Sequence, residues 1–426
     1  MSVKWQLTPY CCLASLLVMS AKVAASDIPG MAPTAPWDLS GYIHYSVSSN
    51  NPNGTSSLVD HLLHQRFNFE YRFDSDLRLN VGMRNRLYYG DSPEIPGFAQ
   101  VIEADSGYMD LSHNWLDSGS WLGNSQFDRL NLSWDMNQDW QLKLGRFRVN
   151  WAMSTLWNPN DIFNAYSIYD VDYAERRGSD AVQLSRQLGF ASSIDAVYSI
   201  NDDNGLDRNL DSYALRYLTN ANGWDLQVLA GKSLTDYVLG AGFAGDIAGA
   251  GLRAEWSYFD PVDETWPGAS HLNHSNNNKP SSPSSLATDI ANQTLPSSHV
   301  ATIEADYSFA SQRNYLVRTS LLYISNPIDA DSALAYLNLP LNARTLSFAN
   351  WTYYVGVSAD ISDLSRLTLS SSYYDDGSYF VGASQSYSLS DDWQVQFILQ
   401  RFDGSGASLF GQTPSTLSYL QFNWSF

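Results

Sequence analysis

Apolar and polar residues alternate with a period of two along most of this chain. In the last run, residues 416–426, one side carries Leu420, Phe422, Trp424 and Phe426, and the other side carries polar residues and one tyrosine. Such alternation places successive side chains on opposite faces of a β-strand. One apolar face and one polar face are typical of a strand with lipid on one side and water on the other.

The alternating runs come in pairs that are joined by very short turns. Runs 62–73 and 77–89, for example, are separated only by Asp74, Ser75 and Asp76, which predicts a hairpin. Runs of about ten residues match the length that a tilted strand needs to cross a membrane. The pattern predicts eighteen strands, or sixteen if one weak pair is misread, and they are 37–47, 62–73, 77–89, 127–136, 140–149, 181–188, 190–200, 213–219, 224–234, 236–245, 250–259, 300–309, 315–325, 351–361, 366–374, 379–389, 393–402 and 416–426.

The connections between these strands also alternate in length. Turns after even-numbered strands are short, whereas long segments at 150–180, 260–298 and 326–347 follow odd-numbered strands. Transmembrane barrels have short periplasmic turns and longer outer loops. This alternation of short and long connections holds if residues 108–116 belong to the second outer loop rather than to a nineteenth strand. The sequence therefore predicts an all-β fold, a transmembrane antiparallel β-barrel over residues 37–426, whose Asn- and Ser-rich outer loop at 260–298 is mobile.

The N-terminus has the features of an export signal. A basic residue, an apolar core and small residues before position 26 predict a signal peptide over residues 1–25. The proline-rich residues 26–36 are then a periplasmic leader. Both cysteines, Cys11 and Cys12, lie in the signal, so the mature protein has no thiol. With the barrel pattern, these features predict a protein of the outer membrane.

The charge of the chain bounds its partners. There are 44 acidic and 24 basic residues, and removal of the signal with Lys4 and Lys22 leaves 22 basic residues and a formal charge of −22. This excess of acid argues against nucleic acid as a partner. Acidic outer loops could hold divalent cations that bridge lipopolysaccharide phosphates. The predicted partners are membrane lipid and lipopolysaccharide, a small polar solute, and the barrel-assembly machinery, which would bind the closing strand that ends at Phe426.

Motifs of enzymes and cofactor sites are weak in this chain. Residues 240–245 match a dinucleotide-binding fingerprint as text, but the alternation continues through them and no helix follows. The pairs His61/His64 and His271/His274 lack a third metal ligand. No G-x-S-x-G motif of a serine hydrolase occurs. We therefore predict no enzymatic activity, no catalytic or metal site, and no cofactor.

The basic residues are concentrated in the first strands of the barrel. Most of them share the inward-facing parity of their strands, which makes them candidates to line the pore. These candidates are Arg66, Arg72, Arg78, Arg84, Arg86, Arg129, Arg146 and Arg148. Strand 140–149 departs from this alternation. We expect a bulge at Gly145 that turns Arg146 and Arg148 inward and turns Phe147, Val149 and Trp151 outward. In the alternative, these two arginines lie above the hydrocarbon.

The segment 150–180 is long, aromatic and acidic, and it follows the basic strands directly. A loop with so many aromatic residues is expected to fold into the barrel and narrow it. Its candidate constriction residues are Trp157, Asp161, Asp170, Asp172, Glu175, Arg176 and Arg177. Arginines that face carboxylates across a confined pore would create a transverse field that orients polar solutes. In the alternative, the loop packs on the rim or plugs the lumen, and its charges neutralise one another.

Three short motifs around this loop resemble a known family. They are LGRFRVNW at 144–151, WNPNDIFN at 157–164 and ERRGSDAV at 175–182. They are similar to the signature of porin-like Gram-negative outer-membrane proteins, which include alginate-export-like channels and the domain of unknown function 1302. Phe147 and Ala152 stand where that family often has Gln and Gly. The resemblance implies an outer-membrane channel whose three motifs meet near a loop at the pore.

These features predict a porin-like channel for the passive passage or export of small polar solutes. Inward arginines favour anionic solutes, whereas the net negative charge favours cations. The rival prediction is a non-conducting assembly or surface protein that binds polysaccharide or a partner and whose lumen is plugged by residues 150–180. An outer-membrane hydrolase is a weaker rival because the nucleophile motif is missing. The chain is predicted to be a monomer or a homotrimer, with the small residues of 236–251 as a candidate contact face.

Overall fold

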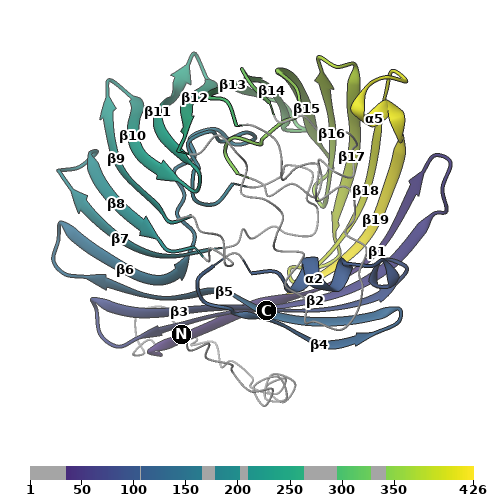
Figure 1. Cartoon of the computed structure of the whole chain (residues 1–426), viewed down its shortest axis with the longest axis horizontal. Coiled ribbons are helices and arrows are strands. Elements are labelled where there is room, and N and C mark those ends of the chain that lie inside the picture. The colour runs from purple at the N-terminus through teal and green to yellow at the C-terminus, as the bar shows by residue number, and fades with distance from the viewer. Residues whose placement is uncertain (1–34, 106, 166–177, 202–209, 263–294, 328–341) are drawn as a thin grey trace.

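The computed structural model describes residues 35–105, 107–165, 178–201, 210–262, 295–327 and 342–426. Within these residues, nineteen β-strands form one sheet that closes on itself into a barrel (Figure 1). The strands are β1 Trp37–Pro52, β2 Leu58–Arg72, β3 Leu77–Gly90, β4 Ser112–Ser118, β5 Trp121–Asp135, β6 Trp140–Phe147, β7 Ser179–Gln187, β8 Ser193–Ser199, β9 Ser212–Ala221, β10 Trp224–Ser233, β11 Asp236–Ile247, β12 Ala250–Pro261, β13 Ser298–Phe309, β14 Tyr315–Ile324, β15 Trp351–Ser362, β16 Ser365–Tyr374, β17 Ser378–Ser388, β18 Trp393–Gly404 and β19 Ser415–Ser425. The short helices η1 Ser92–Glu94, α2 Phe98–Glu103 and α5 Leu409–Gln412 lie in the connections. No helix of the described part is long and apolar enough to span a membrane.

Eighteen of these strands form the barrel wall. β3 pairs with β5 along most of its length. On the opposite edge of β5, β4 pairs with the first half of the strand and β6 pairs with the second half. β4 therefore belongs to the second outer connection, where residues 108–116 were predicted to lie. The prediction of an eighteen-stranded antiparallel barrel is confirmed, and each predicted strand overlaps an observed one.

The first and last strands close the barrel. β1 and β19 are antiparallel neighbours over eleven residue pairs, and the backbones of Gly41 and Phe426 exchange two hydrogen bonds of 3.0 Å. In β19, Leu420 is 40% exposed whereas Gln421 is 2% exposed. The apolar residues of this strand therefore face outward and the polar residues face the interior, as the period of two predicts.

Large apolar side chains cover the outer surface of the barrel. They occupy alternate positions of the strands, and examples are Leu215, Val228, Leu239, Leu369 and Phe397. A continuous apolar surface of this kind is unfavourable in water and favourable against lipid tails. The interior face carries polar side chains instead, among them many of the buried Ser, Asn, Gln and Arg residues. This division of residues makes the chain a transmembrane barrel.

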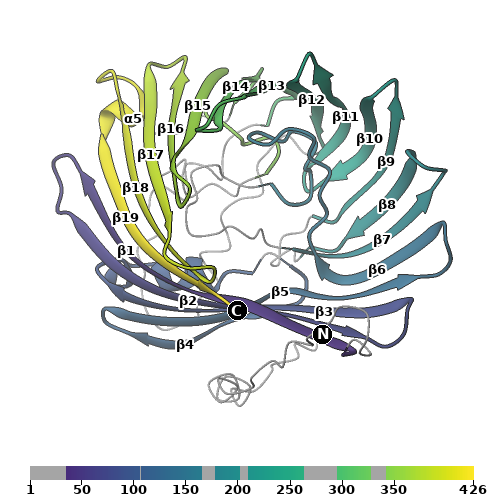
Figure 2. The ribbon, with the colours of Figure 1, turned by 180° about the vertical axis from the view of Figure 1, so that it is seen from behind.

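Several connections fold back onto the inner wall. α2 packs its apolar residues against β2, β3 and β5, and α5 packs against β16, β17 and β18 (Figure 1 and Figure 2). The predicted signal peptide at 1–25, most of the leader at 26–36 and most of the outer loop at 260–298 lie outside the described residues. The division of the chain into these parts stays a prediction.

The predicted bulge at Gly145 is wrong. β6 pairs with β5 and β7 up to Arg146 without a register shift, and Gly145 instead has a positive φ of 108°, which glycine adopts readily. Phe147, Val149 and Trp151 do not turn outward, because each is at most 2% exposed and belongs to an apolar cluster inside the barrel. The chain leaves the sheet after Phe147, and beyond that point strand parity no longer determines where side chains point.

Candidate pore constriction

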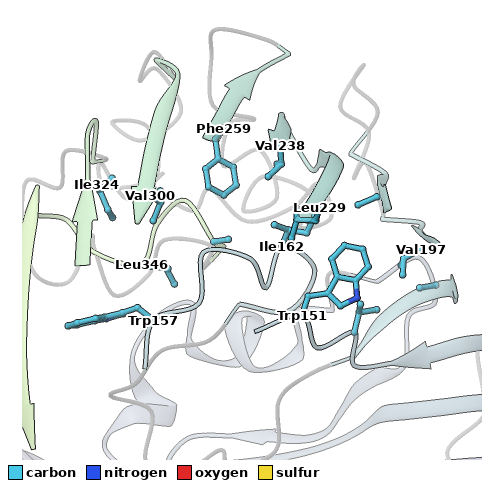
Figure 3. Packing of buried hydrophobic residues seen from close by; sticks show 14 of the residues in the cluster. Trp151, Trp157, Ile162, Val197, Leu229, Val238, Phe259, Val300, Ile324 and Leu346 are labelled. Carbon is cyan, nitrogen blue, oxygen red and sulfur yellow. The ribbon is translucent and has the colours of Figure 1, made fainter. Parts of the chain in front are cut away.

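After β6 the chain turns into the barrel, and residues 149–165, here called the inner loop, lie along the wall. Trp151, Trp157 and Ile162 of the inner loop are buried. They pack in one apolar cluster with interior residues of β8 to β14 and with Leu346 of the connection before β15 (Figure 3). The wall residues of this cluster include Val197, Leu229, Val238, Phe259, Val300 and Ile324. Burial of these side chains holds the inner loop against one side of the barrel.

A carboxylate of the wall binds the backbone of the inner loop. Glu255 of β12 is 2% exposed. One of its oxygens accepts hydrogen bonds from the N–H groups of Met153 (2.5 Å) and Ser154 (2.6 Å), and the other accepts from the N–H of Asn160 (2.9 Å). Glu255 thus satisfies three buried donors that belong to no strand and would otherwise need a partner.

A second wall carboxylate, Glu304 of β13, binds the next residues of the loop. It accepts hydrogen bonds from the N–H of Thr155 (3.0 Å), the hydroxyl of Thr155 (2.7 Å) and the N–H of Leu156 (3.1 Å). Arg253 of β12 lies 3.2 Å from Glu304 and 2.6 Å from Asp306, so one arginine offsets the charge of both acids. Neighbouring strands therefore present two acids to adjoining stretches of the inner loop.

The wall is hollowed where it receives Asn160 of the inner loop. The side-chain amide of Asn160 donates to the backbone oxygen of Ala241 (3.0 Å) and accepts from the hydroxyl of Ser257 (2.8 Å). A β-carbon on Gly240 would lie 2.6 Å from Asn160 Oδ1, and one on Gly242 would lie 3.0 Å from its Nδ2. The glycines that imitate a dinucleotide fingerprint therefore make room for the loop. Gly240 and Gly242 therefore face the inner loop, and the predicted oligomer contact over 236–251 stays a prediction.

The structure describes two of the seven predicted constriction residues. Trp157 is buried, and its ring meets that of Tyr354 from β15 edge to face, with 6.2 Å between the centroids. Asp161 is fully buried, and its carboxylate lies 3.6 Å from the guanidinium of Arg148. The residues outside the described part are Asp170, Asp172, Glu175, Arg176 and Arg177. Their role at a constriction stays a prediction.

Acceptors surround most of the arginines that were predicted to line the pore. Arg66 and Asp128 are both buried and share two hydrogen bonds of 2.5 and 3.0 Å. Asp128 stands at an irregularity in β5, where the pairing register with β3 shifts at Gly82. Arg84 and Arg86 donate to side-chain amides of β5. These three arginines belong to a buried polar network beneath the second outer connection.

Arg146 is the centre of a second buried network. Its guanidinium donates to both carboxylate oxygens of Asp180 in β7, at 2.7 and 2.9 Å. It also donates to the carboxylate of Asp105 (2.5 Å) and to the backbone oxygen of Met109 (2.6 Å), both in the second outer connection. Arg146 therefore holds β6, β7 and an outer connection together. A buried charge that is paired in this way contributes little to the field in the lumen.

The remaining candidate arginines are more exposed. Arg72 pairs with Glu70, and Arg78 pairs with Asp135, each at 2.7 Å. Arg129 lies next to Asp128 in β5, and Arg148 faces Asp161 of the inner loop. Arg146 with Asp180 and Arg148 with Asp161 thus connect the three sequence motifs in space. Among the described residues, carboxylates lie within 4 Å of at least five of the eight arginines, so the wall is less basic than its sequence suggests. These arginines are Arg66, Arg72, Arg78, Arg146 and Arg148.

The wall that faces the inner loop carries residues that sequence reasoning missed. A cavity of about 230 Å³ lies between Leu156 of the inner loop and β15 to β18. Its lining includes Tyr354, Ser370, Phe380, Gln396 and Gln400. Beside it, Arg318 of β14 pairs with Gly356, and its Nε has no hydrogen-bond partner among the described residues. These residues could have been found from the sequence, because Ser, Gly and Gln occupy the inward-facing positions of these strands. A search for charged residues alone overlooks them.

The histidine pairs do not form a metal site in the part that the structure describes. His61 and His64 lie on opposite faces of β2, because they are three positions apart in an extended strand, and His64 is fully buried. His271 and His274 lie outside the described residues. No group of three or more His, Cys, Asp or Glu side chains among the described residues could hold a metal ion.

Comparison with known proteins identifies the fold. No protein-family model matches the chain, and no curated protein is significantly similar to it in sequence. Among solved structures, Pseudomonas aeruginosa OpdQ aligns with a TM-score of 0.56 and 9% identity, over 92% of this chain and 99% of that chain. Acinetobacter baumannii OccAB1 aligns with a TM-score of 0.55 and 10% identity, over 92% and 97% of the two chains. P. aeruginosa OccK11 aligns with a TM-score of 0.54 and 8% identity, over 92% and 96%.

Identity this low shows the fold and does not identify a solute. The similar structures are Gram-negative outer-membrane porins, whereas the resemblance to alginate-export-like and domain-1302 proteins is not confirmed. The barrel and its apolar outer surface agree with an outer-membrane location. The chain is an eighteen-stranded β-barrel of the outer membrane with the fold of Gram-negative porins.

Proposed function

We propose that this protein is a passive channel for small polar solutes. The observation that carries the proposal is the position of the inner loop. Glu255 and Glu304 bind this loop to β12 and β13, while a cavity remains between Leu156 of the loop and β15 to β18. A barrel with this many strands is wide enough to hold water in its lumen. A loop that is anchored laterally narrows such a lumen without filling it. No chemistry is required for passage, and we propose no enzymatic role.

The distribution of charge supports a channel with weak ion selectivity. Carboxylates neutralise most of the arginines that the sequence places along the wall. Arg318, which pairs with Gly356 in the strand next to the cavity, has no ion pair among the described residues and is a cation through which an anionic preference could arise. Whether the barrel is a monomer or a homotrimer, and whether assembly machinery binds the strand ending at Phe426, stay predictions.

Conductance of the refolded mature protein in a planar bilayer tests this function. We expect stable current steps in wild type and larger or noisier steps in Glu304→Gln, because that change weakens an anchor of the inner loop. Glu70→Gln is the matched control, since Glu70 lies on β2 and binds Arg72 rather than the inner loop. A folded barrel that never conducts would overturn the proposal and favour the plugged, polysaccharide-binding alternative.

A further inference from the structure

The wall opposite the inner loop is hollowed near the middle of its strands. Gly356 of β15, Ser370 of β16 and Gly382 of β17 are direct neighbours in the sheet, because Ser370 pairs with Gly356 on one side and with Gly382 on the other. Three small residues side by side leave room on the inner surface of the sheet for larger neighbouring side chains. Ser370 and Gly382 of this row line the cavity of about 230 Å³ that Leu156 of the inner loop faces, and Gly356 lies beside it against the ring of Tyr354.

Two aromatic rings lie along the wall at the edge of this recess. A β-carbon on Gly356 would lie 2.6 Å from the hydroxyl oxygen of Tyr354, and one on Gly382 would lie 2.7 Å from Cζ of Phe380. Each ring therefore extends along its own strand, over the glycine two residues further on. A larger residue at either glycine would push the ring into the lumen. The glycines thus allow both rings to lie flat and to present apolar faces to the interior.

The rest of the lining supplies uncharged groups that can form hydrogen bonds. Ser384, Gln396 and Gln400 line the recess, and their side chains make no hydrogen bond to another described residue. Gln400 is only 5% exposed. A buried amide is costly unless a partner satisfies it, so these groups are available to water or to a solute. No charged residue of the described part lines the recess.

We propose that this recess is a binding subsite for an uncharged, hydroxyl-rich solute, namely a saccharide or another polyol. A sugar ring has apolar C–H faces and polar hydroxyl edges. The faces match the rings of Tyr354 and Phe380 and the side chain of Leu156, and the hydroxyls match the amides of Gln396 and Gln400. The inference rests on the proposed channel function, because the lumen is the route by which a solute reaches the recess.

An anion matches this lining less well. A carboxylate that leaves water needs a cation or several N–H donors to replace its hydration. The neighbouring arginine, Arg318, pairs with Gly356 and is not among the residues that line the recess. The charge of the ligand is therefore the variable that separates a saccharide subsite from an anion subsite.

Equilibrium binding to the folded barrel in detergent micelles tests the inference without requiring conduction. The probes are maltose, which is neutral, and glucuronate, which is an anion, and titration calorimetry follows both. We expect saturable binding of maltose and weaker binding of glucuronate. Gln400→Leu keeps the size of the side chain but removes its hydrogen bond, and should weaken maltose binding by roughly 2- to 12-fold. Gln394→Leu, the same change on β18 outside the recess, should leave it unaltered.

Ser384→Ala serves as a second variant should Gln400→Leu fail to fold, and it should also weaken maltose binding. Absence of maltose binding to a barrel that conducts salt would overturn this inference and leave the channel function intact. Tighter binding of glucuronate than of maltose would also overturn it and would assign the site to Arg318. Maltose binding to a barrel that does not conduct would support the subsite while overturning the channel.

Discussion

Replacing Glu255 with glutamine should loosen the inner loop without leaving a hole in the wall. In the wild type, one carboxylate oxygen binds the N–H groups of Met153 and Ser154, and the other binds that of Asn160. In Glu255→Gln an NH₂ group replaces one of these oxygens, and it cannot accept from an N–H donor. At least one charge-assisted hydrogen bond is therefore lost, and two donors are left facing each other.

The size of this effect follows from the number of hydrogen bonds that are lost. A hydrogen bond to a charged group contributes about 1.5–3 kcal/mol. Losing one should raise the equilibrium constant for release of the inner loop by roughly 10- to 150-fold, because about 1.4 kcal/mol corresponds to a factor of ten. Alanine would remove all three bonds of Glu255, with an upper limit of about 4.5–9 kcal/mol that hydration of the released loop would reduce.

Hydrogen exchange of the barrel in micelles measures this release directly. The amides of Met153, Ser154 and Asn160 should lose protection in Glu255→Gln by the same factor as the opening constant rises. Single-channel recordings of the same variant should show more frequent transitions between conductance levels. Glu70→Gln again serves as the control. Unchanged protection in a folded Glu255→Gln barrel would refute the reasoning and would mean that the apolar cluster alone holds the loop.

Three further changes test the network around Arg146, the charge of the lumen and the contact between the inner loop and the wall. Arg146→Ala should lower the free energy of unfolding by about 3–5 kcal/mol, because it leaves two buried carboxylates without their cation. Urea titration, followed by the heat-dependent mobility of the barrel on gels, measures this free energy, and a loss under about 1 kcal/mol would contradict the prediction. Arg318→Ala should shift the reversal potential under a salt gradient toward cation preference, whereas Arg313→Ala in an exposed turn should not, and equal shifts would rule out a special role for Arg318. Gly242→Val should displace the inner loop, since even a β-carbon would meet it at 3.0 Å, and recordings identical to wild type would argue against that contact.

The architecture of the barrel could be predicted from the sequence because its causes are local. A strand places successive side chains on opposite faces, and the bilayer requires every strand to present an apolar face, so the signal repeats in each strand. β19 shows this in Leu420 and Gln421, which differ from exposed to buried over one position. The alternation of short and long connections then determined which end of the barrel carries the loops and placed residues 108–116 outside the wall.

The interior follows no comparable local rule, and there the sequence was a poorer guide. Parity placed Arg66 on the interior face, but its partner Asp128 is 62 residues away, and only folding shows that the two charges are paired. Asp180, the partner of Arg146, is 34 residues away, and this pair too is seen only in the folded chain. The predicted bulge wrongly turned Phe147 and the apolar residues after it outward, because the sequence does not show that β6 ends at Phe147 and that the chain then enters the barrel.

The sequence by itself determined a membrane-spanning antiparallel barrel, a number of strands near eighteen, and for most strands the side that meets lipid. Only the tertiary structure decided what the interior does. Glu255 and Glu304 look like two acids among many until residues 101 and 149 positions earlier fold against them and use them as acceptors. Lipid surrounds the whole barrel and selects apolar residues at every outward position. Inside the barrel, the partners of each side chain depend on which distant segment packs against it.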